Sequence, residues 1–322
     1  MLLIQVGLVG TGYVAKLRAD CLQADDRAHI ASVTGHNPEK VEAFSQAYGA
    51  KSVADWQDLV AQPELDLVII AAVNRDHGAI AHAALEAGKH VVVEYPLSLD
   101  VAEAEMLLQL AKAKGKMLHI EHIELLSGIH RAVKAALPAI ATPFYVRYNS
   151  LAPQSPAPLK WTYQPDLFGF PFIGALSRIS RLTNLFGQVT AVSGQSRFWD
   201  GAEGFYRTCV CTAQLRFASG LIADTVYGKG EAIWKADRTL EIRGEAGAIV
   251  IEGDQGTLIQ TNQATPLEMG SRRGLFVQDM TMVLDHLTTG APLYVTPEDS
   301  VYALKVADAV RRASESGEAI AV

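Results

Sequence analysis

Cysteine and positive charge are both scarce in this sequence. Its three cysteines, Cys21, Cys209 and Cys211, do not make a disulfide framework. Cys209 and Cys211 are expected to point to the same face of a strand, and with no second pair of metal ligands nearby these two are expected to be structural. The 28 lysines and arginines are outnumbered by 35 aspartates and glutamates, and the formal net charge of −7 argues against broad binding to nucleic acid or anionic lipid. Any anion site must therefore be local.

Long hydrophobic runs and targeting signals are also missing. The longest apolar stretches, such as residues 67–73, are too short to span a bilayer. The first residues have no basic n-region and no cleavage-site pattern. We therefore expect a cytoplasmic protein, and the length of 322 residues suggests two globular domains.

Short β-branched runs alternate with helical patterns in the N-terminal third of the chain. The expected strands cover residues 4–9, 30–34, 67–71, 90–93 and 117–120, and the expected helices cover residues 13–22, 38–48, 77–87 and 101–114. This alternation predicts a parallel sheet wrapped by helices, an α/β Rossmann domain over residues 1–122.

Closely spaced strand patterns follow in the second part of the chain. The expected strands cover residues 189–198, 206–217, 221–227, 238–243, 248–252 and 257–260, and the expected helices cover residues 125–136, 273–289 and 298–316. The pattern predicts an α+β substrate-binding domain over residues 123–322, with a large open antiparallel sheet and helices on one face. Residues 152–158, rich in proline, are expected to form a loop at the substrate site. An open sheet face can pair subunits, so a monomer and a homodimer both stay open.

A dinucleotide-binding motif opens the chain. Gly10-Thr-Gly12-Tyr-Val-Ala15 follows the first strand and begins the first helix. Gly10 allows a tight turn, Gly12 lets the backbone approach a pyrophosphate, and Ala15 permits close helix packing. The phosphates are expected at the helix N-terminus, where free N–H groups favour negative charge.

The end of the second strand bears on the choice of cofactor. An NAD-selective site usually has an acidic residue here to bind the ribose diol. This chain instead has Gly35, His36, Asn37 and Lys40, which leave room for a 2′-phosphate. The sequence favours NADPH, with NADH possible; the alternative is that nothing here selects either one.

Two arginines, Arg178 and Arg181, lie in an otherwise apolar stretch over residues 174–187. The apolar residues recur at helical spacing, so the two guanidinium groups are neighbours on one side of a helix. A permanent charge at the edge of a buried face needs an anion. That anion is either a ligand or a carboxylate elsewhere in the chain.

Three further motifs, Asn74-Arg-Asp-His77, Ala87-Gly-Lys-His90 and Glu94-Tyr95-Pro96-Leu97, accompany the glycine motif. With them the whole chain resembles the glucose-fructose oxidoreductase/inositol dehydrogenase (Gfo/Idh/MocA) family. The resemblance implies a Rossmann domain followed by a substrate domain with an open antiparallel sheet. Where relatives usually have the lysine of Glu-Lys-Pro, this chain has Tyr95. Laid on the family pattern Leu-x-Asp-x-Gly-x-His, Arg178 stands at the aspartate and Arg181 within one residue of the histidine.

These replacements change the expected chemistry. Oxidation of a sugar hydroxyl needs a base with a pKa near neutrality. An arginine stays protonated, and a tyrosine with its ordinary pKa near 10 is a poor substitute. A carboxylated substrate whose hydride acceptor needs positive charge nearby fits the arginines better.

Within the family, Glu94-Tyr95-Pro96 and Glu121-His122-Ile123-Glu124 resemble the biliverdin reductases. The arginine stretch and residues 270–276 resemble the cyanobacterial type in particular. The resemblance implies NADPH-dependent reduction of the tetrapyrrole biliverdin to bilirubin at its central methine bridge. Two alternatives stay open: another NAD(P)-dependent oxidoreductase of the family, acting on a carboxylated sugar or cyclic imine, and a dinucleotide-sensing regulator without catalysis.

The candidate site residues follow from the motifs and the resemblance together. The catalytic candidates are Arg178 and Tyr95, and the substrate-binding candidates are Arg181, His122 and Glu124. The cofactor-binding candidates are Gly10, Thr11, Gly12, Tyr13, Val14, His36, Asn37, Val73, Asn74, His77 and Glu94.

Several of these roles have a structural alternative. The hydroxyl of Tyr95 can donate a hydrogen bond, or its ring can form an aromatic wall. His77 is as well explained as a polar residue at a helix start. The aromatic residues over 161–172 can stack on a tetrapyrrole or pack as an ordinary loop. The histidines and glutamates over 119–130 lack a compact ligand spacing, so no metal is expected.

Overall fold

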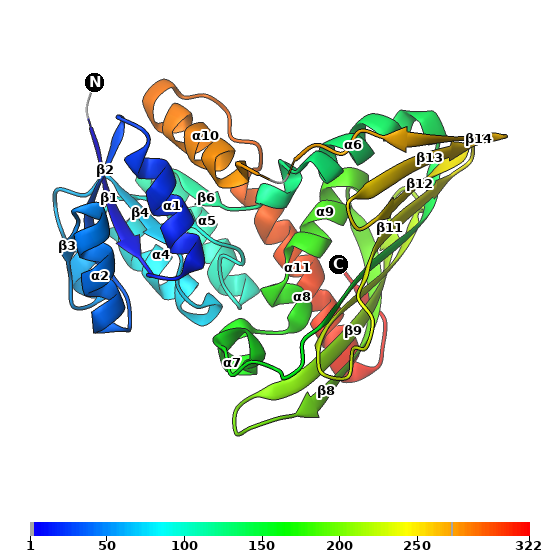
Figure 1. Cartoon of the computed structure of the whole chain (residues 1–322), viewed down its shortest axis with the longest axis horizontal. Helices are drawn as coiled ribbons and strands as arrows, with labels where there is room; N and C mark the ends of the chain where they lie inside the picture. Colours follow the sequence, from blue (N-terminus) through cyan, green and yellow to red (C-terminus); the bar gives the residue numbers. More distant parts are fainter. Residues whose placement is uncertain (1–2, 272) are drawn as a thin grey trace. The chain divides into compact units, whose positions relative to one another are not determined.

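The computed structural model describes residues 3–271 and 273–322, which form two compact units. One unit contains the chain up to Ile123 together with Gly274–Val301. The other contains Glu124–Arg273 and Tyr302–Val322. The segment Gly274–Val301 therefore packs with the N-terminal unit, whereas the division expected from sequence assigns it to the second domain (Figure 1).

The first unit is built on a six-stranded parallel sheet with the order β3-β2-β1-β4-β5-β6. The strands are β1 (Ile4–Val9), β2 (Ala28–Thr34), β3 (Lys51–Ser52), β4 (Leu67–Ile70), β5 (His90–Val93) and β6 (Leu118–Ile120). All four residues of β4 are buried, as expected for a central strand covered on both faces. The order reverses between β1 and β4, which is where doubly wound sheets bind their ligands.

Some helices of the first unit begin at capping side chains. The helices are α1 (Tyr13–Gln23), α2 (Pro38–Tyr48), α3 (Trp56–Val60), α4 (His77–Glu86), α5 (Val101–Lys114) and α10 (Leu275–Thr289). The side chain of Asn37 caps α2 and that of Asp100 caps α5 by accepting backbone N–H bonds. Met280 and Val283 of α10 belong to the same buried cluster as Ala19 of α1, which fixes α10 to this unit.

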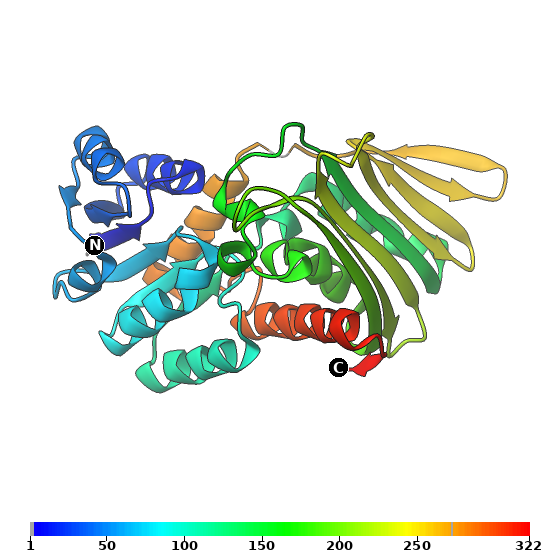
Figure 2. The same ribbon diagram turned by 90° about the horizontal axis from the view of Figure 1, so that it is seen from below.

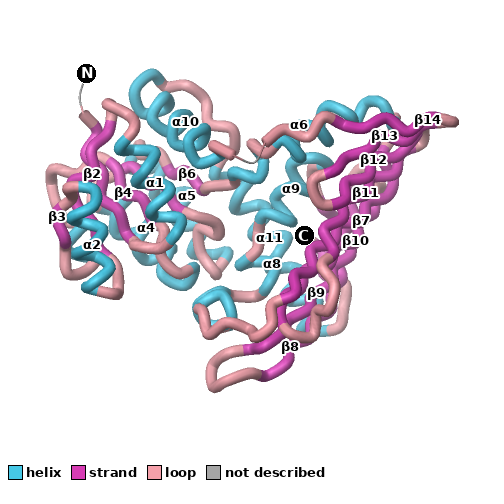
Figure 3. Tube along the Cα trace, in the orientation of Figure 1, coloured by secondary structure: helices cyan, strands magenta, loops and turns pink. Residues whose placement is uncertain are grey.

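The second unit is built on a nine-stranded sheet with the order β14-β13-β12-β11-β7-β10-β9-β8-β15. The strands are β7 (Pro143–Pro153), β8 (Val189–Asp200), β9 (Tyr206–Phe217), β10 (Ile222–Gly230), β11 (Asp237–Gly244), β12 (Gly247–Glu252), β13 (Gln255–Gln260), β14 (Gln263–Leu267) and β15 (Ile320–Ala321). The pairing is antiparallel except between β7 and β10, which run parallel at the centre of the sheet. Figure 3 shows this sheet in magenta as one twisted layer.

Helices gather on one face of this sheet. They are α6 (Gly128–Ala136), α7 (Pro165–Phe168), α8 (Pro171–Gly174), α9 (Ser177–Phe186) and the main part of α11 (Pro297–Ser316). α11 lies along β8, because a Cβ added at Gly194 would approach Val310 to 2.9 Å (Figure 2). Residues of β9 alternate between buried and exposed, so its other face meets solvent.

The predicted fold class is confirmed, with one refinement. The first sheet is parallel, and the second is mixed and mostly antiparallel rather than wholly antiparallel. The sequence reading missed β7, because prolines at both ends and the polar residues Arg147, Asn149 and Ser150 obscure its strand pattern. Within the described residues, no helix combines the length and apolarity needed to cross a membrane.

Candidate functional site

The turn from β1 into α1 has the geometry of a phosphate cradle. Gly10 has φ +121°, and a Cβ there would lie 2.3 Å from the carbonyl oxygen of Ala71. Gly12 is the N-cap of α1, no side chain caps it, and a Cβ there would meet no atom within 4 Å. Ala15 is fully buried against the sheet. The open space over Gly12 and the uncapped N–H groups fit a pyrophosphate.

The other candidates on this turn surround the same helix start. Tyr13 is 77% exposed, while Thr11 and Val14 are half-buried. α1 has no acidic residue in its first turn, so no carboxylate there opposes a bound phosphate. A Cβ on Gly35 would lie 3.3 Å from the Thr11 hydroxyl, which places the end of β2 beside the glycine turn.

The end of β2 offers one exposed imidazole and one amide. His36 is exposed, and Asn37 is half-buried with its side-chain oxygen accepting the backbone N–H of Lys40 at 3.0 Å. Capping of α2 therefore occupies the Asn37 oxygen. Glu39, in the first turn of α2, is exposed.

The segment after β4 contains three of the cofactor-binding candidates. Val73 precedes a 3₁₀ turn that begins at the buried Asn74. His77 is fully buried; its Nδ1 lies 2.8 Å from the carbonyl oxygen of Pro96 and its Nε2 lies 3.2 Å from that of Ala72. Burial lowers the pKa of His77. With both nitrogens engaged by backbone, His77 fixes the segment after β5, which supports its structural alternative.

Tyr95 and His122 form a stacked pair in the first unit. Their ring centroids lie 5.4 Å apart with an interplanar angle of 4°. His122 is buried, its Nε2 lies 2.8 Å from the hydroxyl of Ser300, and its backbone N–H donates to the hydroxyl of Tyr294 at 3.0 Å. Burial, with a smaller contribution from His119, lowers the pKa of His122 to about 3, so this imidazole is neutral.

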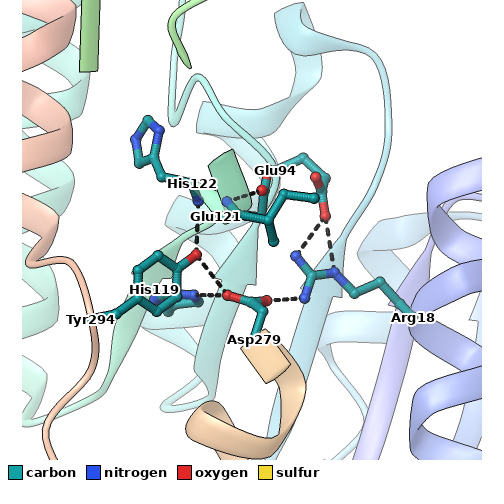
Figure 4. Close-up of polar contacts among 8 residues, drawn as sticks. Arg18, Glu94, His119, Glu121, His122, Asp279 and Tyr294 are labelled. Carbon is teal, nitrogen blue, oxygen red and sulfur yellow. Dashed lines mark hydrogen bonds and ion pairs between the residues drawn. The ribbon is translucent and has the colours of Figure 1, made fainter. Parts of the chain in front are cut away.

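A buried charged network lies beside this pair (Figure 4). The guanidinium of Arg18 donates from Nε and Nη2 to one oxygen of Glu94, at 3.0 and 2.9 Å, and from Nη1 to Asp279. The other oxygen of Asp279 lies 2.8 Å from both the Nε2 of His119 and the hydroxyl of Tyr294. The arginine holds the pKa of Asp279 well below its usual range despite burial.

Glu121 adds a third carboxyl to this region. It is buried, and its side chain accepts the backbone N–H of Ile123. Burial and the nearby carboxylate of Glu94 raise its pKa well above the usual range. Burial and the neighbouring carboxylate therefore favour the protonated form of Glu121 more than that of an exposed glutamate.

The two arginines of α9, in the second unit, have different partners. Arg181 forms an ion pair with Glu124 at 2.9 Å, and its side chain is 6% exposed. Arg178 is half-buried and donates to the hydroxyls of Ser177 and Ser150, at 2.9 and 3.2 Å. Its guanidinium lies over the ring of Tyr227, 5.3 Å from the centroid. The structural alternative therefore describes the Arg181–Glu124 pair.

A second cation, not anticipated from sequence, lies on the same strand as Tyr227. Lys229 of β10 is 7% exposed, and its Nζ donates to the carbonyl oxygen of Thr162 at 2.5 Å. The ammonium lies 4.0 Å from the ring centroid of Phe168, 4.6 Å from that of Tyr163 and 5.6 Å from that of Tyr206. Burial is the main cause that lowers the pKa of Lys229 to about 8, and the charge of Arg178 makes a smaller contribution in the same direction.

The aromatic segment over residues 161–172 packs mostly on itself and on the sheet. Tyr163, Phe168 and Phe172 are buried. Tyr163 contacts Tyr206 with centroids 5.2 Å apart, and Phe172 contacts Tyr227 at 6.4 Å. These rings form an aromatic wall around Lys229 and beneath Arg178, which matches the packed-loop alternative for the buried members.

The structure thus gathers some predicted residues and separates others. Glu94, Tyr95 and His122 come together in the first unit, whereas Glu124, Arg178 and Arg181 lie in the second. Sequence reasoning missed Arg18, Asp279 and Lys229. Arg272, part of the stretch that resembles the cyanobacterial enzymes, lies outside the described residues. Over residues 3–271 and 273–322, no cluster of three or more His, Cys, Asp or Glu could hold a metal.

Comparison with known proteins shows that one solved structure is similar in both sequence and fold over nearly the whole chain. That structure is biliverdin reductase from Synechocystis sp. PCC 6803, in complex with biliverdin and NADP⁺. It is 48% identical, the match covers 97% of this chain and 99% of that one, and the TM-score is 0.95. An NAD binding oxidoreductase from Klebsiella pneumoniae, 18% identical over 99% of each chain with a TM-score of 0.84, shares the fold.

Curated mammalian relatives match over a shorter span. Biliverdin reductase A from Mus musculus is 35% identical over 140 residues, which is 42% of this chain and 43% of the mouse protein. The chain thus matches about two fifths of the length of this relative.

Two family models divide the chain between them. The NAD-binding Rossmann-fold model of the oxidoreductase family matches residues 4–122, and its C-terminal alpha/beta-domain model matches residues 140–322. A nicotinamide dinucleotide is the cofactor of this fold, in agreement with the geometry around Gly10 and Gly12. The chain belongs to the Gfo/Idh/MocA family of NAD-binding oxidoreductases.

Proposed function

We propose that this protein reduces biliverdin, a linear tetrapyrrole with two carboxylate side chains, to bilirubin with NADPH. The observation that carries the proposal is 48% identity to the Synechocystis biliverdin reductase over 97% of this chain. Two features of the chain support it independently. Tyr95 replaces the lysine that family members use at a sugar hydroxyl, and Arg178 contributes a permanent positive charge.

The residues of each unit have separate tasks in this reaction. Bound NADPH supplies a hydride, which forms the new C–H bond at the central methine carbon while a pyrrolic nitrogen gains a proton. Gly12 and the N-terminus of α1 bind the pyrophosphate. Arg178, oriented by the hydroxyls of Ser150 and Ser177, stabilises the negative charge that the pyrrole system acquires.

The proposed roles of the remaining candidates follow their contacts. Tyr95 presents its ring, fixed by the stack on His122, at the carboxyl end of β5. Arg181 and Glu124 neutralise each other and hold α9, so the pigment carboxylates are assigned to Arg178 rather than to Arg181. His36 and Asn37 are assigned to the adenosine ribose, where a 2′-phosphate distinguishes NADPH from NADH.

The experiment is a spectral assay with purified protein, NADPH and biliverdin. Conversion of the green pigment to the yellow one, at a rate higher with NADPH than with NADH, is the expected result. Cofactor binding without pigment turnover refutes the proposal and leaves the two alternatives. Oxidation of a carboxylated sugar with NAD(P)⁺ then tests the first of them, and inactivity on both substrates favours the dinucleotide sensor.

A further inference from the structure

All three guanidinium nitrogens of Arg18 bond to carboxylates of the first unit. Arg18 lies on α1, six residues after the Gly12 N-cap, and its side chain is fully buried. Two of its nitrogens bond to Glu94, the third to Asp279, and the ring of Phe276 lies 5.0 Å from its centre. A buried permanent charge is tolerated only where such anions surround it.

The Glu94 end of this network holds the chain immediately before Tyr95. The backbone N–H of Glu94 donates to Ile70 at 3.0 Å, and its carboxylate accepts both bonds from Arg18. On the other side of Tyr95, the carbonyl oxygen of Pro96 lies 2.8 Å from the Nδ1 of His77. The backbone is therefore held immediately before and after Tyr95.

The Asp279 end of the network determines where the Tyr95 ring packs. Asp279 accepts from the hydroxyl of Tyr294 at 2.8 Å, and that hydroxyl accepts the backbone N–H of His122 at 3.0 Å. His122 is the ring on which Tyr95 stacks. One carboxylate thus controls both the segment that contains Tyr95, through Arg18, and the imidazole beneath it, through Tyr294.

Stability alone does not account for this arrangement. A buried ion pair replaced by well-packed apolar residues often leaves a protein as stable or more so. What an apolar cluster cannot reproduce is a directional link from α1, whose N-terminus takes the phosphates, to the side chain at the carboxyl end of β5. Arg18 makes that link, because its side chain starts on α1 and ends on Glu94.

We propose that Arg18 and Asp279 are positioning residues that set the orientation of Tyr95 relative to the dinucleotide-binding helix. Asp279 lies on α10, so the segment Gly274–Val301 that returns to the first unit completes the site. The effect on turnover rests on the proposed function, whereas the effect on the order of the Tyr95 segment does not.

Two variants test the positioning, with one matched control. Asp279→Asn removes the charge that holds Arg18, and Tyr294→Phe removes only the hydroxyl between Asp279 and His122. Asp285→Asn, also on α10, removes a carboxylate that pairs with Arg27 at 2.6 Å and has no contact with the Tyr95 network among the described residues. If Asp279→Asn does not fold, Tyr294→Phe decides.

The first measurement is backbone hydrogen exchange over residues 94–97 and 119–123, with and without NADP⁺. Both test variants are expected to exchange about tenfold faster there than wild type, while Asp285→Asn matches wild type. The second is pigment turnover: kcat is expected to fall about tenfold or more, with the KM for NADPH nearly unchanged. In a Tyr95→Ala background the same variants are expected to have little further effect on kcat.

Each contrary result has a distinct meaning. Unchanged exchange over residues 94–97 in a folded variant overturns the positioning role, and so does full additivity with Tyr95→Ala. If wild type turns over no biliverdin, the proposed function fails, but the exchange measurement still decides whether Arg18 and Asp279 order the Tyr95 segment.

Discussion

The phenol ring of Tyr95 lies parallel to the imidazole of His122, with centroids 5.4 Å apart and 4° between the planes. Burial lowers the pKa of His122 to about 3, so Tyr95 stacks on a neutral ring rather than on a cation. The stack joins the side chains of the two residues face to face. Protonation of His122 requires that this packing, or the fold around it, give way.

The stability of the protein is therefore expected to depend on pH through His122. Its pKa is about 3 in the folded chain and near 6.5 when unfolded, so between these values the unfolded chain binds more protons. As pH falls from about 6.5, the free energy of unfolding is expected to decrease by about 1.4 kcal/mol per pH unit from this residue.

Denaturant unfolding of wild type and His122→Gln between about pH 5 and 8 measures this contribution. The variant is expected to show a shallower pH dependence than wild type. His29→Gln, at an exposed position of β2, is the control and is expected to keep the wild-type slope. If the free energy of unfolding changes with pH equally in wild type and His122→Gln, His122 is not the source of this pH dependence.

Gly12→Ala is expected to separate cofactor binding from folding. A Cβ at Gly12 meets no protein atom within 4 Å, so thermal stability is expected to stay within a few degrees of wild type. The same methyl group occupies the space for the pyrophosphate, so the Kd for NADPH is expected to rise about tenfold or more, which is ~1.4 kcal/mol.

Gly10→Ala provides the contrast, because its Cβ would lie 2.3 Å from the carbonyl oxygen of Ala71 at φ +121°. That variant is expected to lose stability as well as cofactor binding. Calorimetry of both variants with and without NADPH distinguishes the two cases. If Gly12→Ala binds NADPH with wild-type affinity, the pyrophosphate does not bind at this turn.

The fold could be predicted because its signals are local. The strand–glycine–helix pattern at Gly10 and Gly12 and the regular alternation that follows specify a parallel sheet within short windows of sequence. β7 was not predicted, because its own sequence pattern is weak and it is stabilised by pairing with β10 and β11, which lie far along the chain. Tyr95 and Arg178 became candidates in another way, because the family resemblance implies a lysine and an aspartate at these positions, and their roles stay predictions.

The polar network of the site could not be predicted in the same way. Arg18 and Asp279 are 261 positions apart, and each has the spacing of an ordinary helix residue. Lys229 had a usable signal, because Thr225, Tyr227 and Lys229 alternate inward along β10. A lysine at an inward strand position predicts a buried ammonium, and the turn residues around it obscured that signal.

The two arginines of α9 are expected to respond differently to removal. Arg181→Ala removes the ion pair with Glu124 at a site where the arginine is 6% exposed, so a loss of roughly 2–4 kcal/mol in the free energy of unfolding is expected. Arg178→Ala leaves that pair intact and is expected to reduce pigment turnover by about a hundredfold or more.

Denaturant unfolding, NADPH titration and the pigment assay on both variants test this division. NADPH affinity is expected to stay near wild type in each, since neither residue belongs to the glycine turn proposed to bind the phosphates. Loss of cofactor binding in Arg178→Ala would show that its role is misplaced. A stable Arg181→Ala variant with no turnover would indicate that Arg181, rather than Arg178, binds the substrate carboxylate.

Lys229 is expected to give the protein a second pH dependence, above neutrality. Its pKa is about 8 in the folded chain, lowered from 10.5 by burial and by Arg178, with the thiol of Cys209 opposing. Between these values the unfolded chain binds more protons, so the free energy of unfolding is expected to rise with pH by about 1.4 kcal/mol per unit.

Lys229→Met keeps an unbranched side chain, one atom shorter, among the three rings and removes the charge. The variant is expected to be at least as stable as wild type near pH 7 and to lack the rise above pH 8, because burial outweighs the cation–π contacts. Lys235→Met, at an exposed position, is the control and is expected to keep the rise. A Lys229→Met protein less stable than wild type near pH 7 would mean that the rings around the ammonium, rather than its burial, dominate its energy.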